Sequence, residues 1–209
     1  MDSPKLDELI DSSHFIDDSH KDQCKQYFKQ IHKGLGDWFY SRSISPDMYQ
    51  GDVVNKLDVV YFQIRDDSQE LQIIEDLPCM LLSNTCDMAL EGKSREQYIS
   101  VASIFSFQEF GQQGRLQEYS VNGWENFLKD IKMNRITNIL YIPEKTPLKA
   151  SVIFLDRICS IDPHILKARL GKNKSRRILS LSQVGFYFFL IKLTYHFARY
   201  EDRTEIIRE

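Results

Sequence analysis

The sequence predicts an α+β fold, in which a small, strongly twisted antiparallel sheet or a half-open barrel carries flanking N- and C-terminal helices. Three observations support this prediction. Apolar residues recur at helical spacing between positions 20 and 40, short apolar runs separated by turn residues follow between 53 and 160, and a long apolar segment begins at 184. We expect the two terminal helices to cover a sheet formed by the middle of the chain.

The composition is that of an ordinary soluble protein with one core. The chain has 209 residues, of which 42% are hydrophobic and 27% are charged, and its formal net charge is −3. This charge argues against binding of polyanions by the chain as a whole. Its distribution is uneven, however, because an acidic beginning contrasts with a basic late segment.

The four cysteines are scattered, and none of their spacings is that of a zinc or redox motif. The N-terminus lacks the basic and apolar regions of a signal peptide. The longest apolar run is interrupted by Lys192 and is shorter than the ~20 residues that span a membrane. We therefore expect a cytoplasmic protein with reduced thiols, no membrane segment, no metal and no cofactor.

Residues 1–20 are acidic and rich in serine, and we expect a mobile tail there. Residues 21–45 are assigned to an N-terminal amphipathic helix, which starts near His20 and runs to about Tyr40. Large apolar side chains from Cys24 to Phe39 recur on one face of this helix. We expect this aromatic stripe to pack on the rest of the protein and not to bind a cofactor.

Residues 46–165 are assigned to the sheet or barrel, with an inserted helix near 124–133. Strand segments are expected at Val53-Val54 and at Leu57–Ile64, followed by a turn at Arg65–Ser68. The remaining strand predictions are Leu71–Ile74, Cys79–Leu82, Tyr98–Phe105, Ile136–Ile142 and Ala150–Ser160. The segment Gln108–Gly123 is polar and is interpreted as an excursion from the sheet.

Residues 166–209 are assigned to a basic loop and a C-terminal helix. Ser180–Gln183 offers an N-cap for this helix. The helix is expected to run to about Tyr200 and is apolar nearly all round. Such a helix is buried on several sides or contacts a partner.

Gly51-Asp52-Val53-Val54 opens the first strand, and Leu77-Pro78 opens an apolar strand that ends in Ser83-Asn84, before the strand at Tyr98–Ile104. This order resembles the MazF/PemK toxin family over roughly residues 50 to 105. The resemblance implies an SH3-like β-barrel. For members of the family it also implies ribonuclease activity that depends on an Arg-Pro pair and on a Ser or Thr at the end of the following strand.

The chain departs from this pattern at the catalytic positions. Leu77 stands where the family has the arginine, and a leucine cannot stabilise charge on a phosphate as a guanidinium does. The hydroxyl position falls near Phe105. An active enzyme would need other residues, for which Arg65 and Ser103 are the candidates, and we expect that the family's catalysis is lost.

The polar cluster Ser83–Asp87 ends the strand at Cys79–Leu82. One interpretation is a site, with Asn84, Thr85, Cys86 and Asp87 as binding residues, or with Cys86 as a nucleophile. No histidine is spaced so as to activate that thiol. The interpretation that we favour is a tight turn, in which Asn84, Thr85 and Asp87 satisfy backbone groups and Cys86 fills space as a small buried residue.

A basic run follows the last expected strand. Its members are Lys167, Arg169, Lys172, Lys174, Arg176 and Arg177, and no acidic residue stands among them. Two interpretations stay open, a site for nucleic acid or another anion, and a solvated loop or a partner of the acidic N-terminus. No aromatic residue is interleaved, which argues against stacking of single strands on this run.

From these observations we expect a binding or accessory module that is not itself an enzyme. The aromatic-rich helices favour a protein partner or a homodimer, and nucleic acid is the alternative ligand. The resemblance implies a setting in a bacterial or phage toxin-antitoxin or defence system. The competing hypothesis is a MazF/PemK-like endoribonuclease that uses non-standard residues.

Overall fold

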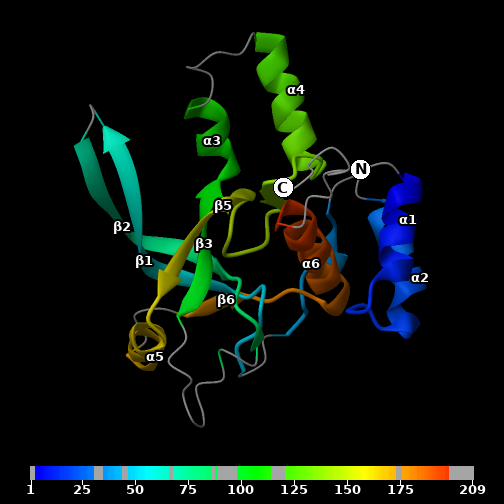
Figure 1. Ribbon diagram of the computed structural model, residues 1–209, viewed down its shortest axis with the longest axis horizontal. Helices are drawn as coiled ribbons and strands as arrows, with labels where there is room; N and C mark the ends of the chain where they lie inside the picture. Colours follow the sequence, from blue (N-terminus) through cyan, green and yellow to red (C-terminus); the bar gives the residue numbers. More distant parts are fainter. Residues whose placement is uncertain are drawn as a thin grey trace, which may run out of the picture.

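The computed structural model describes residues 3–30, 35–43, 47–65, 68–85, 88, 98–113, 121–172 and 176–197. In these residues the predicted α+β class is confirmed, because helices flank a twisted antiparallel sheet of six strands (Figure 1). The strand order is β4-β5-β3-β2-β1-β6, which leaves β4 and β6 at the two edges. The sheet is therefore open, and of the two predicted architectures the twisted sheet is the one found.

The strands are β1 (Val53–Arg65), β2 (Ser68–Leu81), β3 (Ile99–Ser106), β4 (Ile139–Ile142), β5 (Ser151–Ile161) and β6 (Arg177–Leu179). The helices are α1 (Ser3–Ser12), α2 (Asp18–Phe28), α3 (Phe107–Gln113), α4 (Val121–Lys132), α5 (Pro163–Gly171) and α6 (Gln183–Phe197), with a short 3-10 helix η2 (Asp37–Phe39). The inserted helix predicted near 124–133 corresponds to α4. Helix α3 lies in the segment that was predicted as a polar excursion.

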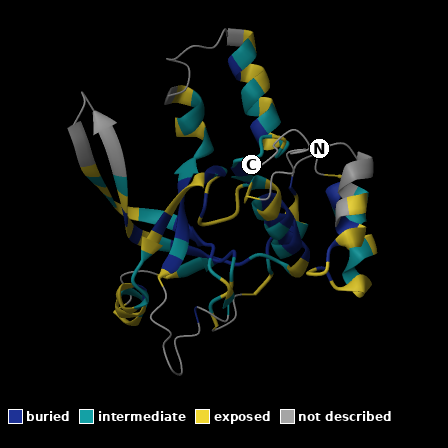
Figure 2. Cartoon of the chain, in the orientation of Figure 1, coloured by how far each residue is buried: buried dark blue, intermediate teal, exposed yellow. Residues whose placement is uncertain are grey.

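β1 and β2 form a long antiparallel hairpin, whose register runs from Val53 opposite Met80 to Arg65 opposite Ser68. Among the described residues, β6 and β3 pair only with the end of the hairpin that holds Val53 and Met80. The rest of the hairpin projects from the sheet as an arm (Figure 1). Figure 2 shows that burial decreases along this arm, away from the centre of the sheet.

Two register shifts bend the arm where it leaves the sheet. Lys56 and Asp76 each adopt a φ of 56° at these irregularities. The backbone N–H of Asp76 donates to Asp58 Oδ1 at 3.1 Å, and Arg169 of α5 donates to Asp58 Oδ2 at 2.6 Å. Helix α5 therefore holds the bend in place.

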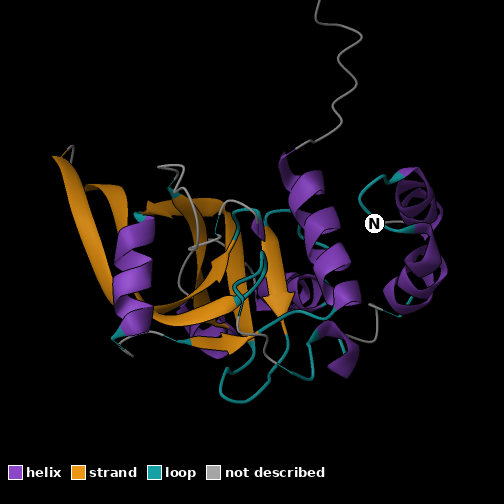
Figure 3. Ribbon diagram, turned by 90° about the horizontal axis from the view of Figure 1, so that it is seen from below, coloured by secondary structure: helices purple, strands orange, loops and turns teal. Residues whose placement is uncertain are grey.

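Helix α6 lies between the sheet and the pair α1–α2 (Figures 1 and 3). Its buried face, with Tyr187, Phe188 and Phe189, belongs to a core cluster that also contains Met80 of β2 and Phe39 of η2. A second cluster covers the opposite face of the sheet, and a third lies under α3 and α4. None of the described helices is long and apolar enough to cross a lipid bilayer.

The N-terminal segment differs from the predicted mobile tail. Residues 3–20 include α1 and the start of α2, and Ile10 and Ile16 are 0% and 2% exposed in the main core. Two ion pairs join α1 to α2, Lys25 Nζ with Asp11 at 2.5 Å and Lys29 Nζ with Asp7 at 2.9 Å. The two buried isoleucines and these lysines order a segment whose composition alone indicates a tail.

Candidate functional site

A groove lies at the N-terminal end of α6, where the chain segments at 38–41 and 180–185 meet. Ser182 caps the helix, because its Oγ accepts from the N–H of Gly185 at 3.0 Å. The same hydroxyl donates to the carbonyl of Trp38, and the N–H of Ser182 donates to the carbonyl of Phe39 at 3.1 Å. The N-cap predicted from Ser180–Gln183 is thus confirmed, and it also fixes η2 against the helix.

The approach of the two segments is close enough to require glycine at one position. A Cβ placed on Gly185 would lie 2.1 Å from the carbonyl oxygen of Phe39. Beyond this contact, Tyr40 forms a β-bridge with Leu181, and the N–H of Ser41 donates to the carbonyl of Ser180 at 2.9 Å. These contacts hold the floor of the groove in one position.

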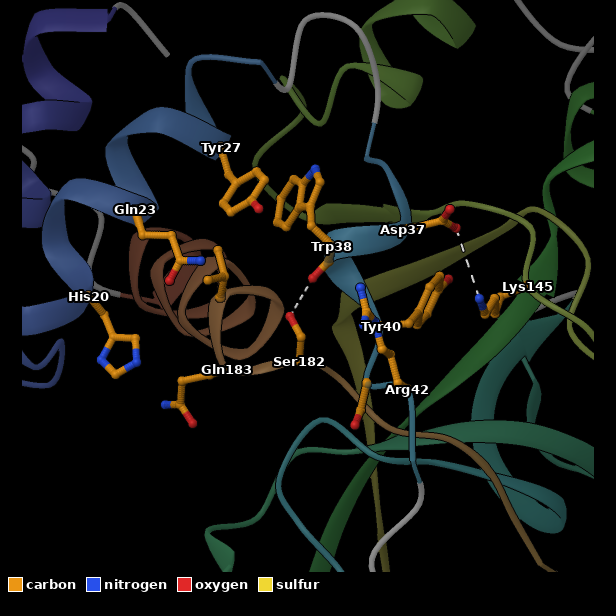
Figure 4. Close-up of a pocket in the computed structure, with 12 residues that line it drawn as sticks. His20, Gln23, Tyr27, Asp37, Trp38, Tyr40, Arg42, Lys145, Ser182 and Gln183 are labelled. Atoms are coloured by element: carbon orange, nitrogen blue, oxygen red, sulfur yellow. Dashed lines mark hydrogen bonds and ion pairs between the residues drawn. The ribbon is translucent and has the colours of Figure 1, made fainter.

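The larger part of the groove is a cavity of about 630 Å³, which we call the cationic pocket (Figure 4). It is lined by His20, Gln23, Tyr27, Asp37, Trp38, Tyr40, Ser41, Arg42, Lys145, Ser182, Gln183 and Val184. The half-buried rings of Tyr27 and Trp38 stack in its wall, with centroids 5.1 Å apart and an interplanar angle of 24°. Aromatic faces of this kind offer a surface for flat ligands.

Two cations give this pocket its name. Arg42 is exposed, and Lys145 Nζ lies 3.9 Å from Asp37 Oδ1 with both side chains in solvent, so that their mutual attraction is weak. Gln183 and Val184 belong to the first turn of α6, whose N–H groups lack partners within the helix. The cations and the positive end of the helix dipole favour an anionic ligand.

The smaller part is a cavity of about 330 Å³, which we call the amide pocket. It is lined by Ser41, Tyr49, Gln50, Asp52, Thr85, Ser180, Leu181, Ser182, Gln183 and Phe186. The two pockets share Ser41, Ser182 and Gln183, and together they form the groove. The two cavities are therefore neighbours at the N-terminal end of α6.

The loop before β1 forms one wall of the amide pocket. Gln50 Nε2 donates to the carbonyl of Leu82 at 2.6 Å, and its backbone N–H donates to Thr85 Oγ1 at 3.2 Å. Gly51 adopts a φ of 89°, and a Cβ there would lie 2.6 Å from Leu181 Cδ1. The backbone conformation at position 51 thus requires glycine, and a side chain there would also displace Leu181.

Two described members of the polar cluster at the end of β2 satisfy backbone groups. Ser83 Oγ accepts from the N–H of Ser100 at 2.8 Å, and Thr85 Oγ1 accepts from Gln50. Thr85 also lines the amide pocket, whereas Asn84 is exposed. Cys86 and Asp87 lie outside the described residues. Thr85 thus has the backbone-satisfying role of the turn interpretation, Ser83 has the same role toward β3, and a ligand role for this cluster stays a prediction.

The basic run is divided between two sites of internal pairing. Arg169 pairs with Asp58 and, at 3.4 Å, with Asp76, and Arg177 pairs with the buried Asp52 at 2.7 Å. Lys167 and Lys172 belong to α5 and its C-cap, Arg176 precedes β6, and Lys174 lies outside the described residues. Carboxylates therefore neutralise two of the predicted anion-binding arginines, and binding of nucleic acid by the others stays a prediction.

The catalytic candidates are not brought together. Ser103 is 2% exposed, and its hydroxyl accepts from Tyr61 at 2.7 Å. The backbone of Arg65 lies at the tip of the arm, four residues or roughly 13 Å along β1 from Tyr61. Leu77 pairs with Leu57 inside the hairpin. The hydroxyl of Ser103 is buried in this conformation, so a phosphate cannot reach it.

Burial also suppresses the reactivity of the thiols in the described part of the chain. It raises the pKa of Cys24 to about 11 and that of Cys79 to about 12, and it raises the pKa of Cys159 as well. Among the described residues, no group of three or more His, Cys, Asp or Glu side chains is placed to hold a metal ion.

Sequence reasoning missed the groove. The sequence places Tyr27 and Trp38 only in a helical stripe, and nothing in it singles out Arg42, Lys145 or Gln183. The one sequence signal for the groove is the N-cap at Ser182, which locates the N-terminal end of α6. No protein-family model and no curated protein sequence matches this chain, so the resemblance to the MazF/PemK family stays a prediction.

Proposed function

We propose that this chain is a binding module without catalytic activity of its own, and that its groove binds single-stranded nucleic acid. The observation that carries this proposal is the combination of the stacked rings of Tyr27 and Trp38 with Arg42 and Lys145 in one pocket. Proteins that bind single strands use aromatic side chains as platforms for bases and cations as contacts for phosphates. The basic run offers no aromatic residue of this kind.

The geometry favours a single strand over a duplex. Base pairs in a duplex hide their faces in the stack, whereas an unpaired base can lie on an aromatic side chain. With only two cations in the pocket, affinity is expected to be modest and to depend on salt. The absence of a catalytic role is supported by the burial of Ser103, which keeps its hydroxyl away from a polymer.

The test is binding of labelled single-stranded RNA, single-stranded DNA and a duplex of equal length, measured by fluorescence anisotropy at several salt concentrations. The integrity of the RNA is followed in the same samples. The double variant Arg42→Glu with Lys145→Glu is expected to weaken single-strand binding by at least about tenfold. It is also expected to reduce the slope of the logarithm of the binding constant against the logarithm of the salt concentration by about 1.4.

A matched control carries the same charge change elsewhere. The double variant Lys167→Glu with Lys172→Glu reverses two charges on α5 and its C-cap, and it is expected to leave binding within about twofold. If this control loses binding and the groove variant keeps it, the basic run is the site and the proposal for the groove is wrong. Cleavage of the RNA would overturn the non-catalytic part of the proposal.

Trp38 provides a second readout. The chain has two tryptophans, and the other one, Trp124, is buried under α3 with its Nε1 bonded to the carbonyl of Gly111 at 3.0 Å. In the variant Trp124→Phe, the remaining indole fluorescence reports Trp38 alone. Quenching of this signal by the single strand, with no change on addition of the duplex, is expected if a base reaches the aromatic pair.

A protein partner is the second candidate, favoured by a different surface. Val60, Leu71 and Ile73 on one face of the arm are 44%, 55% and 58% exposed, and Val60 pairs directly with Ile73. Of the aromatic rings near the two ends of the chain, Phe28, Phe39 and Phe188 pack on one another, whereas Tyr195 and Phe197 at the end of α6 are 42% and 61% exposed. Sedimentation of the protein and of its Ile73→Lys variant tests for self-association through the arm.

A further inference from the structure

His20 lies in the wall of the cationic pocket, across from its two cations. It stands on α2, whereas Arg42 and Lys145 stand on the other side of the pocket (Figure 4). Of the histidines that the structure describes, only this one lines the groove, and its side chain is 37% exposed. A histidine at this place can supply a third positive charge, because its side chain gains a proton between about pH 8 and pH 5.

The hydrogen bonds of the ring leave one nitrogen for a ligand. The hydroxyl of Ser19 donates to the Asp17 carboxylate, and the same oxygen lies 3.1 Å from Nδ1 of His20. Because the hydroxyl proton points to Asp17, the Ser19 oxygen is placed to accept from Nδ1–H. Nδ1 is therefore used within α2, and Nε2 is the nitrogen that takes up a proton and then donates to an anion.

The charged neighbours of His20 on its own helix permit this protonation. The Asp17 carboxylate lies 4.0 Å from Nδ1, and local hydrogen bonds lower its pKa, so that it keeps its negative charge over this pH range. Its attraction for an imidazolium is weak, since both side chains are partly in solvent. Lys21, the next residue, is paired with Asp18 at 2.7 Å.

The other elements around the pocket couple the proton to a ligand. From α6, the ring of Tyr187 meets His20 edge-on with 5.8 Å between centroids, and a phenol adds no charge at these pH values. Asp37 is the one carboxylate in the lining of the pocket, and Lys145 lies 3.9 Å from it. A protonated His20 faces Arg42 and Lys145 as like charges, and a phosphate among these three cations removes that repulsion.

We propose that His20 is a third phosphate contact of the cationic pocket, and that single-stranded nucleic acid binds more tightly when this side chain is protonated. Binding and protonation then favour each other, so the complex takes up a proton from solution near neutral pH. The pocket holds its ligand in mildly acidic surroundings and releases it as the pH rises. This role of His20 rests on the proposed function and adds a pH dependence to it.

The test is fluorescence anisotropy of one labelled single-stranded RNA at about pH 5.5 and about pH 8.5, at a constant ionic strength of about 0.1 M. One added phosphate contact corresponds to about fivefold in affinity at this salt concentration, and the protein is expected to bind more tightly by about this factor at the lower pH. The variant His20→Gln is expected to change by less than about twofold over the same range. His20→Lys carries a permanent cation, and it should bind at the higher pH about as tightly as the protein binds at the lower pH.

His164→Gln is the matched control. His164 is exposed at the start of α5 and lines neither pocket, so the variant removes a histidine from the surface without touching the groove. It is expected to keep the full pH dependence. Calorimetry in two buffers of different ionisation enthalpy gives a second readout, the proton taken up on binding, which should be seen with the protein and with His164→Gln and be lost in His20→Gln.

The outcomes separate the role of His20 from the proposed function. Binding that does not change with pH overturns the role of His20 and leaves a single-strand module. A pH dependence that persists in His20→Gln also overturns it, because the proton is then taken up elsewhere. If His20→Gln unfolds at a lower urea concentration than the protein, His20→Lys decides, and its failure to bind tightly at the higher pH overturns the role. If no strand binds at either pH, the proposed function and the role of His20 are both wrong.

Discussion

Arg177 and Asp52 form an ion pair of 2.7 Å although 125 positions separate them in the chain, and their side chains are only 7% and 1% exposed. The pair joins β6 to the residue that precedes β1. Arg177 also donates to the backbone carbonyl of Asp47. A residue predicted as a contact for nucleic acid is thus a structural link beside the amide pocket.

Removing one member of this pair should be strongly destabilising. Arg177→Met leaves the Asp52 carboxylate buried without its cation, and we expect a loss of about 3–5 kcal/mol in the free energy of unfolding, measured by urea denaturation. Adding Asp52→Asn should recover part of the loss, because the amide still accepts from Tyr49 without carrying a charge. Arg169→Met is the comparison, and its more exposed pairs should account for less than about 1 kcal/mol. Similar losses of stability for the two variants would contradict the assignment of Arg177 to a buried structural ion pair.

The contact between α6 and η2 should tolerate no side chain at Gly185. Gly185→Ala places a methyl group against the carbonyl of Phe39, and we expect a loss of about 2–3 kcal/mol. At the end of α5, a Cβ on Gly171 would meet no atom within 4 Å, so Gly171→Ala is expected to stay within about 0.5 kcal/mol or to be slightly stabilising. Chemical denaturation of the two variants tests this difference directly.

Lys192 should give stability an unusual dependence on pH. It is 3% exposed, its ammonium donates to the carbonyls of Asn134 and Ile136, and burial lowers its pKa from 10.5 to about 8. Between these pH values the unfolded state binds more protons than the folded state, so this group makes the free energy of unfolding rise with pH, by up to about 3 kcal/mol.

Other buried groups act in the opposite direction. Burial raises the pKa values of Cys79 and Tyr61 to about 12, so the stability that they contribute is lost as the pH rises above their unfolded values. The quantity to measure is therefore the difference between the protein and Lys192→Met from pH 8 to 10.5. A difference that does not change with pH would show that Lys192 titrates normally.

The three described cysteines should react slowly with alkylating reagents at neutral pH. With a pKa of about 11, only roughly one Cys24 thiol in ten thousand is ionised at pH 7, and the fraction for Cys79 is smaller. Mass spectrometry of the folded protein and of Cys86→Ser is expected to show at most one rapidly labelled site. Rapid labelling confined to Cys86 would support its role as a nucleophile. Rapid labelling of Cys79 would contradict the burial of its side chain.

The approximate positions of β1 to β5 along the chain and the inserted helix were predictable because their signals are local. Alternation, turn residues and the apolar face of α4 are all visible within about a dozen residues. The end of the first long helix was not predictable. Helix α2 stops at Phe28. Trp38 and Phe39 belong instead to the 3-10 helix η2, where the hydroxyl of Ser182 donates to the carbonyl of Trp38. That contact joins positions 144 residues apart, and no local pattern reports it.

The groove was beyond prediction for the same reason. Its walls come from α2, η2, the loop at Lys145, the loop before β1 and the start of α6. Each residue has an ordinary local explanation, for example Tyr27 as part of an apolar stripe. Likewise, the charges of Arg169 and Arg177 are visible in the sequence, but their partners on the hairpin and before β1 are not.

The dependence of the groove on residues 180–184 has a consequence for biosynthesis. The β1–β2 hairpin is made of neighbouring segments and can form as soon as it leaves the ribosome. The segment Ser180–Val184, which closes the groove and reaches back to Phe39, is synthesised much later. A nascent chain therefore lacks the assembled site until residues 180–184 have also left the ribosome, and only a molecule in which the early and late segments are in contact can bind a ligand there.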